Sequence, residues 1–278
     1  LYAGLGGTFD VCNILGKIDE ERKVSTSFIQ VGPKKIKNKI SKKNQKTYFI
    51  RTYKFLSFFY FIPILKKLII EKPDLIFIHN FQVLPIFLYK IISYKNLKII
   101  YVDHTPNNLK SFKDFFICKI SKLIIDFFIV LNKDSYNYFI KNIRLNPKRI
   151  KIIPNAINKN FIKNDNKKSK AKNTLVVGMA SRINNLKRHD LIIDAIQHDI
   201  LKNFNIKAYF AGDGENINFL KNKIFKKNTF KFSGVLNLKK LKKWYNSLDF
   251  YIQATTGEGH STSILQAMGM NLPVLASN

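Results

Sequence analysis

Two cations stand at a turn where an expected strand is followed by an expected helix. Arg182 and Lys187 come after an apolar run at 174–177 and before a segment of helical period that begins at residue 188. The amino terminus of a helix carries a partial positive charge, so two cations beside it can converge on an anion such as a diphosphate. An Arg and a Lys at this spacing are also common surface residues, and the pair alone does not separate the two interpretations.

An acidic residue stands in a second loop of the same kind. Glu258 lies between two glycines after the apolar run at 250–253. Ser261 or Thr262 can cap the helix that follows, which leaves N–H groups directed at the end of the sheet. Gln266 falls about one turn inside that helix, near the end that would face a ligand. A capped helix with an incidental Glu and Gln is the simpler alternative.

Two glycine-rich turns accompany these loops. Gly212 and Gly214 form a Gly-x-Gly turn, but Ile217 stands where a dinucleotide fingerprint has its third glycine, so a nicotinamide cofactor is not indicated. Near the beginning of the chain, Gly6 and Gly7 would let the backbone approach a phosphate closely. A tight turn that binds no ligand explains the presence of Gly6 and Gly7 equally well.

The elements that must position these loops alternate along the chain. Short runs rich in Ile, Val and Phe alternate with stretches of helical period, a pattern typical of βαβ units and a parallel sheet. Strands are expected at 26–31, 75–79, 99–103, 127–131, 150–153, 174–177, 207–210, 229–232, 250–253 and 274–276, and helices of the second half at 188–201, 216–225, 238–247 and 262–270. The fold class is therefore α/β, and the loops of interest follow strands.

The composition is that of a globular chain. Its 278 residues are 46% hydrophobic and 24% charged, which excludes a disordered or collagen-like chain. The two cysteines, Cys12 and Cys118, have no metal-binding spacing, so we expect no disulfide framework, no thiolate zinc site and a reducing, cytosolic location. The longest apolar stretch, at 55–65, contains a proline and is too short for a membrane-spanning helix of about 20 residues.

The charge is strongly positive. There are 48 basic and 18 acidic residues, a net charge of +30, and residues 1–171 hold 33 of the basic and 11 of the acidic ones. Lysines number 42 and arginines six, whereas readers of base edges rely on arginine, so nucleic acid is not the expected partner. Two interpretations remain open: a solvated lysine-rich surface, and attraction to an anionic membrane.

Two stretches of the first half have the composition of a membrane contact. Residues 34–46 contain seven lysines and no acid, and residues 53–70 form a strongly aromatic and aliphatic helical candidate. Apolar residues beside a cationic patch are typical of interfacial segments. Core packing explains the aromatic stretch equally well.

The motifs together resemble retaining glycosyltransferases of family 4, also called group 1, which have the GT-B fold. The resemblance covers almost the whole chain and is more specific in the second half. It rests on the order and spacing of Gly178 with Arg182 and Lys187, residues 154–158, the 212–214 turn, residues 232–234, the 258–274 segment, the 4–7 glycines, residues 73–79 and His104. It implies two doubly wound, Rossmann-like domains that face each other across a cleft.

This resemblance gives the expected domains. The acceptor-binding domain is expected at 1–157, a linker poor in large apolar residues at 158–173, and the nucleotide-sugar-binding domain at 174–278. Because the family's chains are longer, we expect the chain to be a fragment truncated at both ends. The first strand of the first domain and the last part of the second would then be missing.

The resemblance also assigns roles to residues. Arg182 and Lys187 would bind the donor diphosphate, Glu258 would contact the donor sugar, and His104 would face the reacting sugar. The implied donor-binding set is Gly6, Gly7, Arg182, Lys187, Gly234, Val235, Glu258, Gly259, His260, Ser261, Thr262 and Gln266, and the implied catalytic set is His104, Glu258, Arg182 and Lys187. Asp103 is not expected to orient His104, because neighbouring side chains of a strand point to opposite faces. His79 is interpreted as structural.

One position departs from the family pattern. The family carries a second carboxylate eight residues after the first, on the ribose hydroxyls, and this chain has Gln266 there. A glutamine keeps one carbonyl acceptor and loses the charge. We expect donor affinity to be weaker by about 1–2 kcal/mol, without being abolished.

The resulting expectation is a retaining hexosyltransferase that uses a nucleotide-sugar donor and no metal or other cofactor. The acceptor is expected to be a lipid-linked or surface saccharide, as in polysaccharide or lipopolysaccharide synthesis, and the location cytoplasmic or peripheral at the inner face of the membrane. Four alternatives stay open: a donor-binding pseudoenzyme, a basic membrane-binding α/β protein, a nucleic-acid-associated α/β protein, and another GT-B enzyme such as a nucleotide-sugar epimerase.

Overall fold

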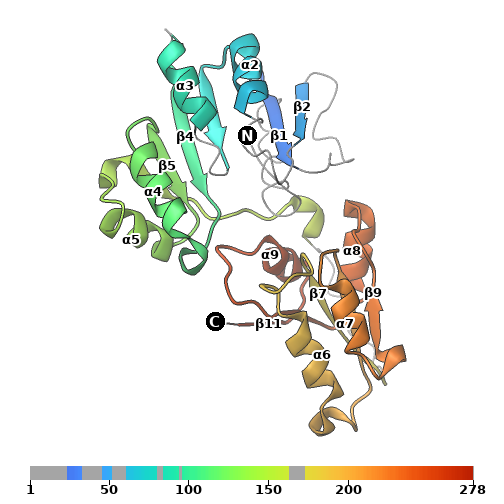
Figure 1. Ribbon diagram of the computed structural model, residues 1–278. Helices are drawn as coiled ribbons and strands as arrows, with labels where there is room; N and C mark the ends of the chain where they lie inside the picture. The colour runs from blue at the N-terminus through green and yellow to red at the C-terminus, as the bar shows by residue number, and fades with distance from the viewer. Residues whose placement is uncertain are drawn as a thin grey trace. The chain divides into compact units, whose positions relative to one another are not determined.

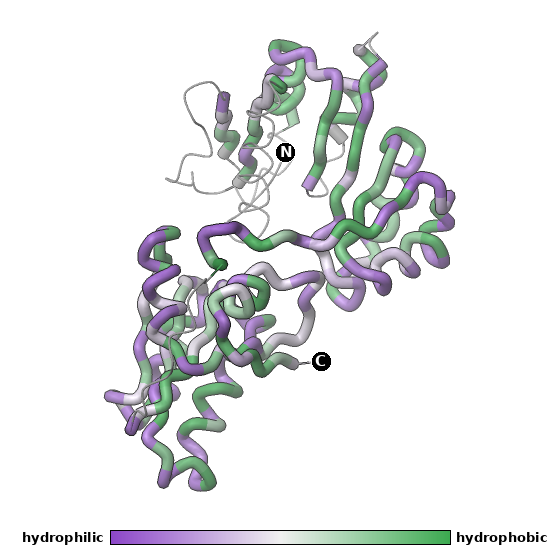
Figure 2. Tube along the Cα trace, turned by 180° about the vertical axis from the view of Figure 1, so that it is seen from behind, coloured by the Kyte–Doolittle hydropathy of each residue, from purple (hydrophilic) through white to green (hydrophobic). Residues whose placement is uncertain are grey.

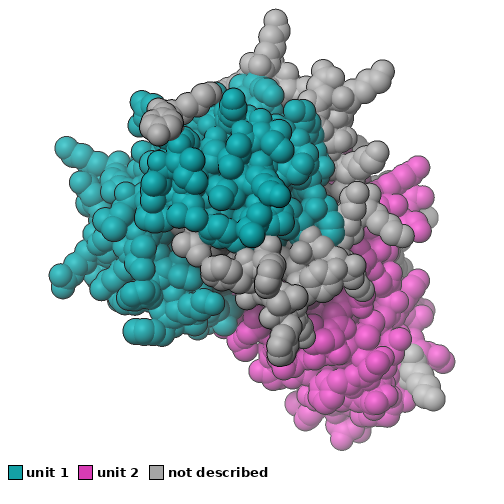
Figure 3. Space-filling view, turned by 45° about the horizontal axis from the view of Figure 1, so that its top comes forward, with its two compact units in different colours: residues 1–155 teal, residues 156–278 magenta. Residues whose placement is uncertain are grey.

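The computed structural model describes residues 24–32, 46–51, 61–79, 84–93, 96–162 and 173–277. The chain divides into two compact units, residues 1–155 and 156–278 (Figure 3). This division lies two residues before the expected end of the first domain. All described strands of both units are parallel; unit 1 has two sheets and unit 2 has one (Figure 1).

Unit 1 contains a parallel pair and a parallel four-stranded sheet. The pair is β1 (Ser27–Gly32) and β2 (Lys46–Arg51), and the sheet has the order β3 (Leu75–Ile78), β4 (Lys98–Asp103), β5 (Phe127–Val130) and β6 (Ile150–Ile152). Its helices are α2 (Phe61–Glu71), α3 (Leu84–Ile92), α4 (Phe112–Ser121) and α5 (Lys133–Lys141), with 3-10 turns at Asn107–Leu109 and Pro147–Arg149. Their apolar faces form one continuous core with the strands.

Local sequence explains where the later helices of unit 1 begin. The Ser111 side chain accepts from the Asp114 backbone N–H while Asp114 accepts from the Ser111 N–H, a reciprocal cap at the start of α4. The Asn132 side chain caps α5 by accepting from the Ser135 N–H.

Unit 2 is a doubly wound five-stranded sheet. Its order is β11 (Val274–Ala276), β10 (Phe250–Gln253), β7 (Leu175–Ala180), β8 (Ile206–Ala211) and β9 (Phe230–Phe232), all parallel. Its helices are α6 (His189–Gln197), α7 (Ile217–Asn222), α8 (Leu238–Asn246) and α9 (Thr262–Gly269), with 3-10 turns at Lys159–Phe161, Asp199–Leu201 and Lys227–Thr229.

Both faces of this sheet are covered. One core cluster joins the strands to α6 and α7, and the other joins them to α8 and α9. Neighbouring Val176 and Val177 enter different clusters, as the alternation of side chains along a strand requires. In Figure 2, hydrophobic stretches run along extended segments and along the coiled helices. The strands are rich in apolar residues because a parallel strand is buried on both faces.

The elements expected from the sequence form, with some differences. All expected strands are present, and their bounds agree within about one residue except at β7, which was expected at 174–177 and continues to Ala180. β2 is an additional strand that the sequence analysis did not predict. The helix expected at 188–201 ends at Gln197, because His198 is extended, and the one expected at 216–225 is shorter. Of the helix expected at 53–70, the part from Phe61 forms α2, and residues 52–60 lie outside the described residues.

The first residues of the expected linker belong to unit 2. Residues 159–161 form a 3-10 turn, and Phe161 is completely buried against Tyr245, with ring centroids 5.7 Å apart. The expected linker is polar on average, and the sequence analysis therefore did not recognise that Phe161 packs in the core of unit 2.

No helix of the described residues is long and apolar enough to span a membrane.

Candidate functional site

The strand order of unit 2 creates one topological switch point. From β7 the chain proceeds outward to β8 and β9, then crosses back to β10 and β11 on the other side of β7. In open α/β sheets, ligands bind at the carboxyl ends of the two strands that flank such a point. The loop after β7 carries Arg182 and Lys187, and the loop after β10 carries Glu258.

The two loops are joined directly. Lys187 Nζ forms an ion pair with Glu258 Oε2, with side chains that are 17% and 32% exposed. The Thr255 hydroxyl and the Thr256 N–H both donate to the Leu186 carbonyl oxygen, each at 3.0 Å. The structure therefore brings together the expected cation and carboxylate. Arg182 is exposed in the same loop as Lys187.

The Gly212–Gly214 turn packs against the Arg182 loop. Gly212 has a φ of +136°, and a Cβ there would overlap the Ser181 carbonyl oxygen. A Cβ at Gly214 would overlap the Ile183 carbonyl oxygen. The glycines thus allow the close backbone approach that fixes the loop on both sides of Arg182.

Helix α9 begins beside Glu258. The Ser261 side chain accepts from the Ile264 N–H, so Ser261 is the cap, and its hydroxyl also lies 3.0 Å from that of Ser263. In the sequence, Gly259 and His260 come just before the first residues of α9, whose backbone N–H groups, including that of Thr262, begin the helix. Such a terminus favours a bound anion.

Gln253 is a site residue that the sequence analysis missed. Its side chain is 1% exposed at the end of β10, and its Nε2 donates to Glu258 Oε2 at 3.4 Å. Its Oε1 accepts from the Tyr251 hydroxyl at 2.8 Å and from the Ser263 hydroxyl at 3.4 Å. These two donors turn the amide so that its N–H faces the carboxylate. A polar residue in an otherwise apolar strand was the available signal.

Gln266 is buried in the first turns of α9, beside a tyrosine of α8. It is 6% exposed, and its Oε1 accepts from the Tyr245 hydroxyl at 3.1 Å inside unit 2. The sequence analysis expected this carbonyl oxygen near the ligand-facing end of the helix, and that role for Gln266 stays a prediction.

In unit 1, His104 pairs with His79. His79 Nδ1 and His104 Nε2 are 2.9 Å apart, and the rings are stacked with centroids 5.2 Å apart, because β3 and β4 are neighbours. Burial lowers the pKa of His104 to about 4 and that of His79 to about 2, so both are neutral near pH 7. Asp103 binds Lys110 Nζ at 2.9 Å instead, in accord with the opposite directions of neighbouring strand side chains.

The remaining expected site residues are placed as follows. Gly234 has a φ of +64°, and its carbonyl oxygen accepts from the Gly212 N–H at 2.8 Å. Val235, next in the chain, is exposed, and His260 is half-buried. Gly6 and Gly7 lie outside the described residues. No group of three His, Cys, Asp or Glu within the described ranges is arranged to hold a metal.

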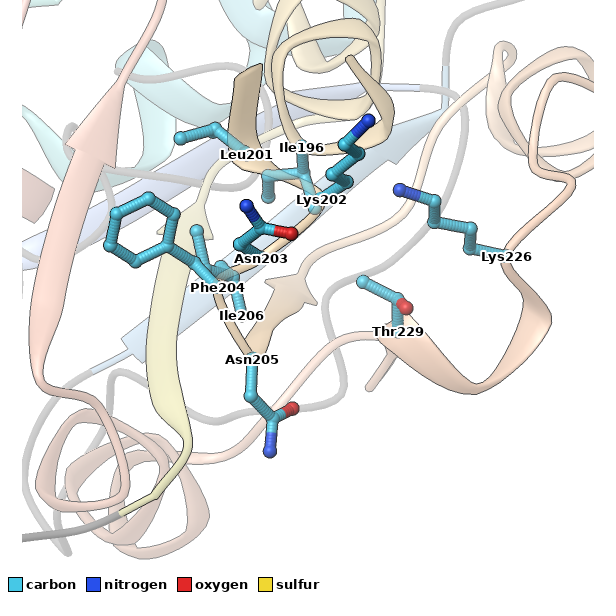
Figure 4. A pocket seen from close by; sticks show the side chains of 9 residues that line it. All are labelled: Ile196, Leu201, Lys202, Asn203, Phe204, Asn205, Ile206, Lys226 and Thr229. Atoms are coloured by element: carbon cyan, nitrogen blue, oxygen red, sulfur yellow. The ribbon is translucent and has the colours of Figure 1, made fainter. Parts of the chain in front are cut away.

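A cavity of about 370 Å³ lies at the opposite edge of the same sheet (Figure 4). It is lined by Ile196, Leu201, Lys202, Asn203, Phe204, Asn205, Ile206, Lys226 and Thr229. These residues stand at the amino ends of β8 and β9 and include none of the expected site residues. The cavity is therefore separate from the loops at the switch point.

Both parts of the chain match families of sugar-transferring enzymes. Residues 33–161 match Glycosyltransferase Family 4, and residues 173–278 match Glycosyl transferases group 1. This chain belongs to the family 4, group 1 glycosyltransferases.

Among the relatives of this glycosyltransferase chain is Protein CapJ of Staphylococcus aureus, 33% identical over 110 residues. That match covers 38% of the chain and 28% of CapJ. The structure of HepE of Anabaena in complex with UDP-glucose has a TM-score of 0.73 and 17% identity, over 98% of this chain and 77% of HepE. That of WaaG, a glycosyltransferase involved in lipopolysaccharide biosynthesis, has a TM-score of 0.76 and 14% identity, over 99% of this chain and 79% of WaaG.

These likenesses establish the fold of the glycosyltransferase chain as GT-B, as its sequence predicts.

Proposed function

We propose that the chain transfers a sugar from a nucleotide-sugar donor to a saccharide acceptor. The observation that carries the proposal is the meeting of Lys187 and Glu258 at the switch point of unit 2, in a chain of this family. The HepE structure, which contains UDP-glucose, supports a nucleotide sugar as the donor class. The finer assignment is a hexosyltransferase that retains the anomeric configuration.

The chemistry requires neutralisation of a leaving group. Breaking the sugar–phosphate bond develops negative charge on the departing diphosphate, and fixed positive groups lower the barrier to that step. Arg182 and Lys187, with the amino terminus of α9, supply such groups from one unit. We therefore assign the transfer as metal-independent and expect its rate to be unaffected by a chelator.

Glu258, which pairs with Lys187, is also assigned to contact the donor sugar. A diphosphate at Lys187 competes with the carboxylate for the ammonium group, and its arrival would release Glu258 to accept hydroxyl groups of the donor sugar. Gln253 keeps its N–H on Glu258 during this exchange, so the carboxylate stays oriented. His104, from unit 1, is assigned to face the reacting sugar as a neutral imidazole.

The acceptor assignment rests on charge and on relatives. Residues 1–171 hold most of the excess lysine, which fits an anionic acceptor such as a lipid-linked or surface saccharide. WaaG, which acts in lipopolysaccharide biosynthesis, has the same fold. We assign the protein to the cytoplasm or the inner face of the membrane, with a role in polysaccharide or lipopolysaccharide synthesis.

The test uses the purified chain and a panel of nucleotide sugars. We expect one of them to raise the melting temperature, and Lys187→Met to abolish the shift and any transfer. Lys202→Met removes an equal charge from an exposed position at the opposite edge of the sheet and serves as the control. The absence of a shift with every nucleotide sugar, or an equal loss in both variants, would contradict the proposal.

A donor-binding protein without turnover is the second candidate. The buried Gln266 amide favours it, because its carbonyl oxygen is engaged by Tyr245 and no carboxylate stands at this position. A melting-temperature shift without hydrolysis or transfer would select this candidate. Transfer that is lost in Lys187→Met would exclude it.

A further inference from the structure

Helix α4 presents a second apolar face on the side away from the core. Three apolar residues of the helix are exposed: Phe112 (82%), Phe116 (56%) and Ile120 (49%). Leu123, in the turn after the helix, is 78% exposed. We call these four residues the α4 ridge. Spacings of four, four and three residues place them within a sector of roughly 80° around the helix axis.

The opposite side of α4 is already used for packing. Cys118 and Ser121 are buried there, and Cys118 belongs to the core of unit 1. A helix that is apolar on both sides is normally covered on both sides, and a continuous exposed apolar strip marks a contact surface. The α4 ridge is therefore a surface that needs a partner.

Charge identifies the kind of partner. Lys113 and Lys119 fall on either side of the ridge at about 100° per residue, and both are exposed. Lys119 Nζ lies 4.7 Å from the Phe115 ring centroid, so its stem runs along apolar surface. The acid of α4, Asp114, lies on the far side of the helix and is bound to the N–H and hydroxyl of Ser111.

We propose that the α4 ridge docks unit 1 onto an anionic lipid bilayer. Its aromatic and aliphatic side chains would enter the boundary between headgroups and acyl chains, while the flanking lysines meet lipid phosphates. An apolar strip with cations on both sides fits an anionic surface better than a second copy of this chain, whose net charge of +30 repels it. The inference does not depend on sugar transfer.

The proposal assigns the contact to a segment that the sequence analysis did not consider for it. Of the stretch expected at 53–70, Ile64 and Leu68 are buried in the core of unit 1, whereas Ile62, Ile69 and Ile70 are exposed. The other candidate, 34–46, lies outside the described residues except for Lys46, the first residue of β2.

The experiment is flotation of the purified chain with vesicles of phosphatidylcholine alone or mixed with phosphatidylglycerol. The test variant is Phe112→Ser/Phe116→Ser, and the control is Phe204→Ser/Phe219→Ser, which removes two phenylalanines that are 65% and 61% exposed in unit 2. We expect the test variant to lose about tenfold or more in binding to anionic vesicles, and the control to keep it. Unchanged melting temperatures verify folding.

A second pair of variants tests the lysines. Lys113→Ser/Lys119→Ser should weaken binding to anionic vesicles more at low salt than at high salt, whereas Lys239→Ser/Lys242→Ser should not. In Phe116→Trp, the indole emission should shift to the blue on anionic vesicles, against the background of the buried Trp244.

Two results would overturn the proposal. One is equal vesicle binding by the wild type and Phe112→Ser/Phe116→Ser. The other is a wild-type dimer in light scattering that this variant converts to a monomer, without vesicle binding, which would make the ridge a self-association surface. Nucleotide-sugar binding, measured on the same variants in solution, reports separately on the proposed function.

Discussion

Tyr251 shows how a single hydroxyl can act on the site from the interior. The side chain is completely buried, and burial raises the pKa of its hydroxyl above the usual value, so it remains a neutral donor. The hydroxyl donates to Gln253 Oε1, and Gln253 in turn donates to Glu258. The orientation of the carboxylate therefore depends in part on a hydroxyl group buried inside unit 2.

Tyr251→Phe tests this chain of hydrogen bonds. We expect a loss of about 1–2 kcal/mol in the free energy of unfolding, because the buried Gln253 Oε1 loses the nearer of its two donors. We also expect severalfold weaker binding of the donor sugar. Urea unfolding and nucleotide-sugar titration measure the two effects. Tyr209→Phe, on β8 of the same sheet, is the control. Donor affinity that stays at the wild-type value in Tyr251→Phe would show that Gln253 holds Glu258 without help.

Gln266→Glu tests the missing carboxylate. The Tyr245 hydroxyl can donate to a carboxylate as it does to the amide oxygen, and the restored charge should improve donor affinity by about 1–2 kcal/mol, measured by calorimetric titration. Gln197→Glu buries the same carboxylate in α6, away from the switch point, and should lower stability without improving affinity. Equal donor affinity in Gln266→Glu and the wild type would remove this position from the ribose site.

At the scale of elements, the glycine turn after β8 determines the position of the loop after β7. Gly212 and Gly234 both have positive φ angles, but only a Cβ at Gly212 meets another backbone segment, the Ser181 carbonyl. The φ of +64° at Gly234 lies in the left-handed region that other residues can adopt, whereas the φ of +136° at Gly212 is nearly restricted to glycine. An added side chain at Gly212 therefore meets both a larger backbone strain and an overlap with the Ser181 carbonyl oxygen.

Gly212→Ala should accordingly cost more than Gly234→Ala. We expect roughly 1–2 kcal/mol for the left-handed conformation at Gly234, and a larger loss at Gly212 because the Arg182 loop must move. Thermal unfolding measures the difference. Equal losses of stability in the two variants would mean that the turn and the Arg182 loop pack loosely.

At the scale of the whole molecule, both units contain buried neutral histidines. Burial lowers the pKa of His104 and His189 to about 4 and that of His79 to about 2, against 6.5 in an unfolded chain. The unfolded chain thus binds protons that the folded chain does not as the pH falls below about 6.5. Acid therefore favours unfolding.

We expect the contribution of these histidines to the free energy of unfolding to be constant above pH 7. It should fall between about pH 6.5 and 4. For each group, a pKa difference of one corresponds to about 1.4 kcal/mol. Urea unfolding across this range measures the slope, and His189→Phe should reduce it. His198→Phe, at an exposed position, should leave it unchanged. A stability that does not vary from pH 7 to 4.5 would contradict neutral burial.

The sequence by itself determined the alternation of strands and helices and the order of the motifs. Side-chain periodicity and capping residues such as Ser261 act over a few residues, so they can be read locally. The family resemblance placed Arg182, Lys187 and Glu258 in one site, and the structure brings Lys187 and Glu258 into contact. Arg182 precedes Lys187 in the same loop and is exposed, and its part in the site stays a prediction.

The tertiary structure alone decided the contacts between distant elements. Sequence pattern does not reveal that β10 pairs with β7, that Gln253 faces Glu258, or that Tyr245 engages Gln266, because each depends on which strand lies beside which. The same holds for the α4 ridge, since apolar residues on a helix are buried or exposed according to what packs against them. Periodicity fixes the faces of an element, but the surrounding fold decides which of those faces meets water.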